Sequence, residues 1–195
     1  LARLGFGKFH IADMDRFDIV NVNRQIGAKR SNFGKEKAKV MEKEIKEINP
    51  YAKVKIFPKG FHKDNADEFL DGVDVAIDGL DFFNIEERML YFRKAREKGI
   101  YAVTAGPIGF GTAYLIFSPT GMSFERYFDI SEETPIVEKY FSFLLGLSPH
   151  AYFTRYTQKR TVKLEKKSGP SSCIAINLCA AFASFEAMNI VLKKR

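Results

Sequence analysis

The chain has 195 residues, which is the length of about one domain. Hydrophobic residues make up 46% and charged residues 28%, a composition that is typical of a globular protein and excludes a disordered or collagen-like chain. The 31 Lys and Arg residues exceed the 24 Asp and Glu residues, and the formal net charge of +7 permits the binding of anions such as nucleotides without requiring it. Two cysteines are too few for a four-thiolate zinc site, and we expect a reducing, cytoplasmic setting.

The first and last segments are apolar. Leu1 to Gly5 has the pattern of the last turn of a helix that ends at Gly5, so we expect an N-terminal segment to precede it. The chain shows no signal-peptide pattern. The segment 173–192 is long enough to span a membrane, but its polar residues Asn177, Glu186 and Asn189 are costly in lipid. A helix buried in the core of a soluble protein is the better interpretation.

Strand and helix patterns alternate along the first 117 residues. Residues 8–13 predict a strand, 15–31 a polar loop, and 34–48 a helix with apolar residues three or four positions apart that ends at Asn49-Pro50. Further strands are predicted over 54–57, 73–77, 100–105 and 112–117, and a helix begins at the capping residue Asn84 and ends at Lys98, before Gly99. This order predicts an α/β fold with an open, Rossmann-like, doubly wound and mostly parallel sheet.

Ligands of such sheets bind beyond the carboxyl ends of the strands. The residues to consider there are Asp13, 78–81 and 104–107.

Residues 120–170, with prolines at 119, 135, 149 and 170 in or next to them, predict an irregular insertion, facing a substrate or a second subunit, before the long apolar helix. Its basic stretch 155–167 alternates with apolar residues, which favours a solvated hairpin over a nucleic-acid patch. The aromatic residues of 122–130 and 140–145 favour core packing. The alternative is an apolar surface that receives a protein tail or a second subunit.

The glycine pairs Gly5-Phe-Gly7 and Gly109-Phe-Gly111 do not form a dinucleotide-binding loop. Both lack the third glycine of G-x-G-x-x-G, and the first pair precedes a strand where a phosphate loop would follow one. We interpret them as turn glycines. If the protein binds a nucleotide, its phosphate loop is expected in the preceding segment.

The loop after the first strand carries the most specific pattern in the chain. Residues 13–25 read D-M-D-R-F-D-I-V-N-V-N-R-Q, and 34–38 read G-K-E-K-A. Together they resemble the D-x-D-x-V-x-x-S-N-L-x-R-Q … G-x-x-K-A signature of the ThiF/MoeB/HesA superfamily, the proteins similar to ubiquitin-activating enzymes. Residues 78–81, D-G-L-D, resemble the D-x-T-D-N turn of that family, and 169–172 with the following helix resemble its closing helix.

The resemblance implies a single nucleotide-binding domain over residues 1–195 that lacks its first strand and Gly-rich loop. It implies an enzyme that adenylates a carboxylate with ATP and Mg²⁺ and releases pyrophosphate. The carboxylate is usually the C-terminal glycine of a ubiquitin-like or sulfur-carrier protein. In such a reaction negative charge gathers on the phosphates, and catalysis consists mostly of positioning and electrostatic stabilisation.

The resemblance also implies roles for six residues. Asp13 would bind the ribose hydroxyls, since a carboxylate can accept from both. Arg24 and Lys37 would hold the phosphates, with Lys37 in the first turn of a helix, where the dipole favours an anion. Asn21 and Gln25 would supply neutral hydrogen bonds, and Asp81 would bind magnesium and orient the pyrophosphate.

The chain departs from the family pattern at several positions. Val20 and Phe82 replace a Ser and an Asn, and Arg88 stands two positions from the family's arginine in the helix after Asp81. No cysteine lies between Asp81 and Gly169 and no CxxC pair occurs, so we expect neither a thioester step nor zinc. Cys173 and Cys179 are expected to be buried apolar residues. The three histidines, His10, His62 and His150, are expected to be structural or solvated.

Three other interpretations stay open. A tRNA threonylcarbamoyl-adenosine dehydratase belongs to the same superfamily, and the net charge is compatible with tRNA. A non-catalytic scaffold subunit is a second alternative, although such subunits commonly lose the site residues that this chain keeps. An NAD- or FAD-dependent oxidoreductase shares the fold but lacks the Asn-Arg-Gln loop. The resemblance favours a homodimer that acts away from membranes.

Overall fold

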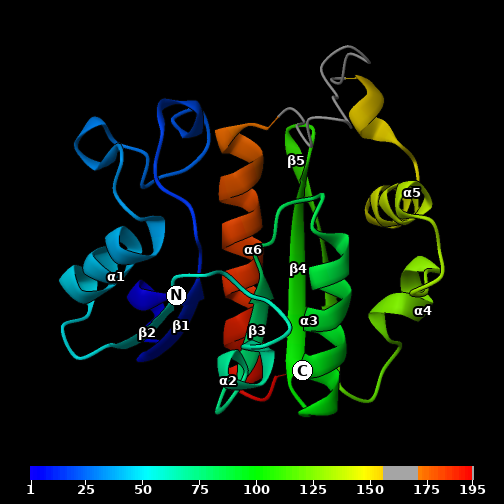
Figure 1. Ribbon diagram of the computed structural model, residues 1–195, viewed down its shortest axis with the longest axis horizontal. Coiled ribbons are helices and arrows are strands. Elements are labelled where there is room, and N and C mark those ends of the chain that lie inside the picture. Colours follow the sequence, from blue (N-terminus) through cyan, green and yellow to red (C-terminus); the bar gives the residue numbers. More distant parts are fainter. Residues whose placement is uncertain (156–170, 195) are drawn as a thin grey trace. The chain divides into compact units, whose positions relative to one another are not determined.

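A computed structural model describes residues 1–155 and 171–194 (Figure 1). The chain divides into two compact units, Leu1–Asp71 and Gly72–Arg195. The first unit contains the loop of the family signature, and the second contains the Asp78–Asp81 turn and the long C-terminal helix.

The first unit is a strand–helix–strand arrangement. After the 3-10 helix η1 (Ala2–Leu4), strands β1 (Lys8–Ala12) and β2 (Lys53–Phe57) pair in parallel, with Phe9 opposite Val54, and helix α1 (Lys37–Ile48) connects them and packs on β2. The 3-10 helices η2 (Ile19–Asn21) and η3 (Arg30–Asn32) lie in the loop before α1, and helix α2 (Ala66–Phe69) follows β2. The His10 ring Nδ1 donates to the Phe69 carbonyl oxygen at 2.7 Å, a structural role as predicted.

The second unit contains a three-stranded sheet in the order β3–β4–β5. Strands β3 (Val75–Asp78) and β4 (Tyr101–Ile108) are parallel, with Asp78 opposite Thr104. Strand β5 (Gly111–Phe117) returns antiparallel to β4 through the turn at Gly109, whose φ of 61° suits glycine. Parallel pairing of β3 and β4 requires a crossover, which helix α3 (Ile85–Glu97) supplies.

Helices cover both faces of this sheet (Figure 1). Tyr114 of β5 stacks on Phe182 of helix α6 (Cys173–Val191), with ring centroids 4.9 Å apart. Phe117, an odd number of residues further along the same strand, contacts Phe92 of α3 at 5.0 Å. Because successive strand side chains point to opposite faces, α6 and α3 pack on opposite sides of the sheet.

The α/β class predicted from the sequence is confirmed by these parallel and mixed sheets, and the predicted strands and helices are present with small shifts at their ends. The expectation of an irregular segment after residue 120 is wrong for much of its length. Helices α4 (Phe124–Phe128) and α5 (Ile136–Leu147) form there, followed by the 3-10 helix η4 (Tyr152–Arg155). Among the described residues, Pro119 precedes α4, Pro135 stands directly before α5 and Pro149 lies between α5 and η4, positions where proline is tolerated. The predicted hairpin over 155–167 lies, apart from Arg155, outside the described residues.

The aromatic run is divided between core and surface. Phe124, Phe128 and Phe143 are buried against one another, whereas Tyr127 and Phe141 are exposed. Core packing therefore explains the three buried rings but not the two exposed ones.

Helix α6 is long and apolar enough to cross a membrane by length and composition, but it contacts β3, β4 and β5. The expectation of a helix buried in the core holds for only part of its surface. One stripe packs on the sheet, including the fully buried Glu186, while Ile174, Leu178, Phe182 and Phe185 on another stripe are exposed. The expectation of two buried cysteines is wrong for Cys173, which is exposed at the first turn, and right for Cys179.

Candidate functional site

Asp13, Asp15 and Lys37 come together where β1 ends and α1 begins. Lys37 is the first residue of α1; its Nζ donates to Asp15 Oδ2 at 2.8 Å, and its backbone N–H donates to the Asp15 carbonyl at 2.9 Å. The Asp15 N–H in turn donates to Asp13 Oδ1 at 2.8 Å. Since a strand end and a helix start are tied by three hydrogen bonds, the lysine is held close to both carboxylates.

Burial and the neighbouring groups act on the pKa of Asp13 in opposite directions. Burial raises the pKa of Asp13 above its ordinary value, while the Asp15 N–H and the Lys37 ammonium favour the ionised carboxylate and offset part of that shift. The Lys37 side chain is only 10% exposed, whereas the Asp15 side chain is 64% exposed. An incoming anion can therefore replace the exposed partner of a lysine that is already positioned.

The η2 loop places the other three residues of the family signature. Asn21 is buried, and its Oδ1 accepts from the Asp18 N–H at 3.0 Å in a reciprocal cap, so one of its polar atoms stabilises the loop itself. Arg24 donates through Nη1 to the Val20 carbonyl at 2.9 Å and to Asn23 Oδ1 at 3.0 Å. The Nε and Nη2 atoms of Arg24 take no part in these two hydrogen bonds. Gln25, the next residue, is half-buried, and its backbone N–H donates to the Asn21 carbonyl oxygen at 2.9 Å.

A hollow of about 470 Å³ lies in the first unit between α1 and the segment that precedes it. Its lining includes Arg16, Lys29 and Lys39 but not Asp13, Arg24 or Lys37. Among the lysines there, Lys29 pairs with Glu44 at 3.0 Å and Lys39 with Glu36 at 2.8 Å. The lining of this hollow has five basic and three acidic side chains and does not include the signature residues Asp13, Arg24 and Lys37.

In the second unit, Asp81 stands in a turn just beyond the end of β3. Its Oδ1 accepts from the Phe83 N–H at 3.1 Å, and its carbonyl accepts from Asn84, whose side chain makes no capping hydrogen bond at the start of α3. Asp81 is exposed. No cluster of three His, Cys, Asp or Glu side chains fit for a metal occurs in the part of the chain that the structure describes.

A single exposed carboxylate fits magnesium, because Mg²⁺ is usually held by one or two carboxylates together with substrate phosphates. Asp81 would hold the ion, and the phosphates and water would complete its coordination.

Behind this turn lies a buried ion pair that the sequence indicates only weakly. Asp78, at the end of β3, accepts from Arg88 Nε at 2.7 Å, from Thr104 Oγ1 at 2.8 Å and from the Leu80 N–H at 2.9 Å. The sequence analysis considers Arg88 only as a displaced counterpart of a family arginine. The sequence places Thr104 among the strand-end residues and Asp15 inside the family signature but assigns no role to either, because the partner of each lies 26 or 22 residues away.

In the first unit, Asp13, Asp15 and Lys37 form one cluster of charged groups, and the η2 loop carries the remaining signature residues. Asp81 belongs to the second unit. The fold and these residues together define an α/β protein of the superfamily that the signature indicates. A family model described as the ThiF family matches residues 1–194, and the chain belongs to that family.

The similar curated proteins are named as tRNA threonylcarbamoyladenosine dehydratases and as adenylyltransferases, so their names do not agree on one substrate. The chain is 33% identical over 110 residues to a tRNA threonylcarbamoyladenosine dehydratase of Haemophilus influenzae, covering 56% of this chain and 41% of that protein. It is 42% identical over 83 residues to a probable molybdopterin-synthase adenylyltransferase of Porphyra purpurea, covering 43% of this chain and 22% of that one. The chain thus spans less than half the length of these curated relatives.

A solved structure of the Escherichia coli tRNA N6-threonylcarbamoyladenosine dehydratase, TcdA, has the same fold. It superposes with a TM-score of 0.63 at 22% identity, over 99% of this chain and 79% of that one. This likeness confirms the Rossmann-like fold class predicted from the sequence.

Proposed function

We propose that the protein is an ATP-dependent adenylyltransferase that activates a carboxylate with release of pyrophosphate. The observation that carries the proposal is the Lys37 ammonium held 2.8 Å from Asp15 at the first turn of α1, next to Asp13. A cation at a helix N-terminus beside a strand-end carboxylate suits the two ends of a nucleotide, its phosphates and its ribose.

In the proposed reaction a carboxylate oxygen attacks the α-phosphorus of ATP, and the bond from that phosphorus to the bridging oxygen of the β-phosphate breaks. An acyl-adenylate and pyrophosphate result. Arg24 with its planar fork and Lys37 with its point charge stabilise the charge that gathers on the phosphates. Asp13 accepts from the ribose hydroxyls, and Asn21 and Gln25 bind nearby polar groups. Bound magnesium supplies further neutralisation of phosphate charge, and Asp81 is the residue proposed to hold it.

We further propose the C-terminus of a ubiquitin-like or sulfur-carrier protein as the carboxylate, and a cytoplasmic homodimer as the working form. The family relationship supports these assignments, and no CxxC pair that would suggest zinc is present in the sequence.

A second candidate is an ATP-dependent enzyme that acts on a modified tRNA adenosine. The relative named as a tRNA threonylcarbamoyladenosine dehydratase favours it, as does the formal net charge of +7.

The test is ATP–pyrophosphate exchange by the full-length protein, after calorimetry has established that it binds magnesium–ATP. Candidate carrier proteins, free carboxylates and tRNA are offered separately, beside Asp81→Asn and the matched variant Glu87→Gln, which changes an exposed carboxylate of α3. Exchange that requires one carboxylate, disappears in Asp81→Asn and persists in Glu87→Gln supports adenylation. ATP binding with turnover only in the presence of tRNA supports the second candidate. Absence of ATP binding contradicts both and favours a scaffold subunit.

A further inference from the structure

The turn that carries Asp81 is built around one buried guanidinium. Arg88 Nη2 donates to the carbonyl oxygens of Leu80 at 2.6 Å and Asp81 at 3.2 Å, and Nη1 donates to that of Phe82 at 3.4 Å. Three successive carbonyls therefore face one side chain, which restricts the conformation of the turn. Without a buried donor these carbonyls would lose their partners, and the turn could adopt other conformations.

The same guanidinium neutralises a carboxylate that has almost no access to water. The side chains of Arg88 and Asp78 are 3% and 1% exposed, and their Nε–Oδ2 distance is 2.7 Å. Burying a charge is costly unless it is paired and hydrogen-bonded, and here Thr104 and the Leu80 N–H complete the shell around Asp78. The pair ties the end of β3, the neighbouring strand β4 and helix α3 to the turn.

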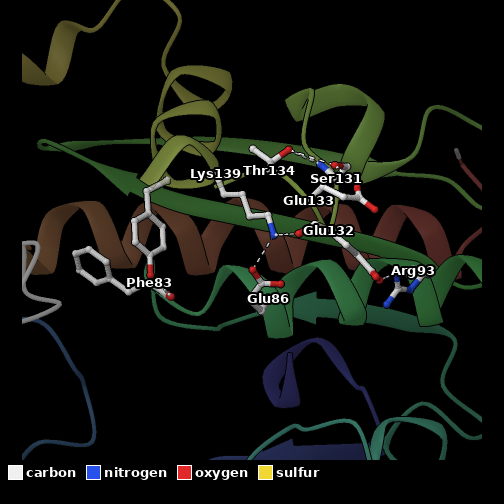
Figure 2. A network of polar contacts seen from close by, with 9 residues as sticks. Phe83, Glu86, Arg93, Ser131, Glu132, Glu133, Thr134 and Lys139 are labelled. Atoms are coloured by element: carbon white, nitrogen blue, oxygen red, sulfur yellow. Dashed lines mark hydrogen bonds and ion pairs between the residues drawn. The ribbon is translucent and has the colours of Figure 1, made fainter. Parts of the chain in front are cut away.

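Helix α5 braces this assembly from the other side. The Phe143 ring centroid lies 4.5 Å from the Arg88 guanidinium carbon, and the Tyr140 hydroxyl donates to the Phe83 carbonyl at 3.1 Å. The buried Lys139 donates to Glu86 at 2.7 Å and to the Glu132 carbonyl, which joins α5 to the first turn of α3 (Figure 2). The turn is thus held by contacts on both sides.

We propose that Arg88 is a positioning residue that fixes the Asp81 carboxylate in the orientation needed to bind the magnesium of magnesium–ATP. This inference rests on the proposed function. Arg88 acts through the turn and does not touch the ligand, because its side chain is buried and its hydrogen bonds go to Asp78 and to the turn carbonyls. A lysine at this position keeps the charge for Asp78 but loses the planar fork that reaches the carbonyls.

The test is the magnesium dependence of ATP–pyrophosphate exchange in the full-length protein. Arg88→Lys is expected to raise the magnesium concentration for half-maximal exchange roughly 10- to 100-fold, since a shift of about 1 Å in a positioned group has an effect of that order. Its affinity for ATP measured in EDTA is expected to equal that of the wild type, because Asp81 contributes only through the ion. Arg93→Lys is the matched control and is expected to change neither quantity. The side chain of Arg93, also in α3, is 42% exposed and pairs with Glu132 at 2.7 Å.

Thr104→Val is the second variant, used where Arg88→Lys does not fold. It removes one hydrogen bond from Asp78 at nearly constant volume and is expected to shift the magnesium requirement in the same direction by a few-fold. Wild-type magnesium dependence in a folded Arg88→Lys protein overturns the inference. A lower rate with an unchanged half-maximal magnesium concentration also overturns it, because that result indicates only a loss of folded protein.

Asp81→Asn separates failure of this inference from failure of the proposed function. If Asp81→Asn abolishes exchange or raises its magnesium requirement, and the Arg88 and Thr104 variants leave that requirement unchanged, the positioning role is wrong and the metal role of Asp81 stands. If Asp81→Asn leaves the requirement unchanged, the assignment of Asp81 in the proposed function is wrong, and the positioning inference is overturned with it.

Discussion

Lys37 Nζ lies 2.8 Å from Asp15 Oδ2, and the backbone N–H of the same lysine donates to the carbonyl of the same aspartate at 2.9 Å. Two hydrogen bonds between one pair of residues fix both the main chain and the side chain at the start of α1. The ammonium therefore does not have to be ordered when an anion binds, and less side-chain entropy is lost on binding.

Lys37→Met is expected to weaken ATP binding at least about tenfold, which corresponds to about 1.4 kcal/mol. Stability is expected to change by no more than about 1 kcal/mol, since the partner carboxylate is 64% exposed and remains solvated. Calorimetric titration with ATP and chemical denaturation measure the two quantities. Lys39→Met is the control on the same helix, as Lys39 pairs with Glu36 on the surface. Equal ATP affinity in Lys37→Met and wild type would remove Lys37 from the site.

Asp13→Asn is expected to abolish ATP binding while making the fold more stable at neutral pH. Burial raises the pKa of Asp13 in the folded state, so the folded protein holds that proton more tightly than the unfolded chain. The free energy of unfolding therefore falls as the pH rises from about 4 through the raised pKa. The asparagine cannot titrate and does not show this loss.

Denaturation of Asp13→Asn and wild type at several pH values measures this effect. The advantage of the variant is expected to be absent below about pH 4 and to reach its full size once the pH exceeds the raised pKa of Asp13. An advantage that grows as the pH falls would have the wrong sign and would contradict the burial effect.

Cys173 is expected to react with a thiol reagent in the native protein, and Cys179 only after unfolding. Cys173 is exposed, whereas burial raises the pKa of the Cys179 thiol, whose Sγ lies 3.0 Å from Thr112 Oγ1. Spectrophotometric titration should find one fast thiol in buffer and two in guanidinium chloride. In Cys173→Ser the fast thiol should be missing, and two fast native thiols in the wild type would refute the packing of α6 on β5.

Gly146→Ala is expected to destabilise the protein although alanine is the better helix former. This substitution stabilises a helix interior by about 1 kcal/mol, and Gly146 lies in the last turn of α5, where the gain is smaller. The added Cβ, however, would overlap the ring of Phe128, whose centroid lies 4.6 Å from that of Phe124 and 5.0 Å from that of Phe143. Overpacking of this kind costs about 1–3 kcal/mol, so we expect a net loss of up to about 2 kcal/mol by chemical denaturation.

The control for this prediction is a double-variant cycle. In a Phe128→Leu background the ring is gone, and Gly146→Ala is expected to cost less or to stabilise. The same loss in both backgrounds would mean that the cost does not come from Phe128.

Sequence alone located most elements because their signals are local. The alternation over 8–13, the three-to-four spacing up to Ile48 and the stop at Gly99 each depend on residues within one turn or strand, and β1, α1 and α3 follow within a few positions. The helices α4 and α5 were missed because prolines at 119 and 135 indicate interruption. In the structure Pro135 immediately precedes α5, where a missing N–H costs nothing.

For the candidate site, the sequence by itself determined the family, the fold class and the residues that carry charge: Asp13, Arg24, Lys37 and Asp81. These follow from residue identity and spacing along the chain. Only the tertiary structure decided that Lys37 is held by Asp15, that Asn21 caps its own loop, and that Arg88 organises the Asp81 turn with Asp78 and Thr104. The partners in these contacts are separated by up to 26 residues along the chain, and strand register decides whether they meet. A buried charge is stable only where its partner is buried beside it, and the sequence alone does not show which residues meet in this way.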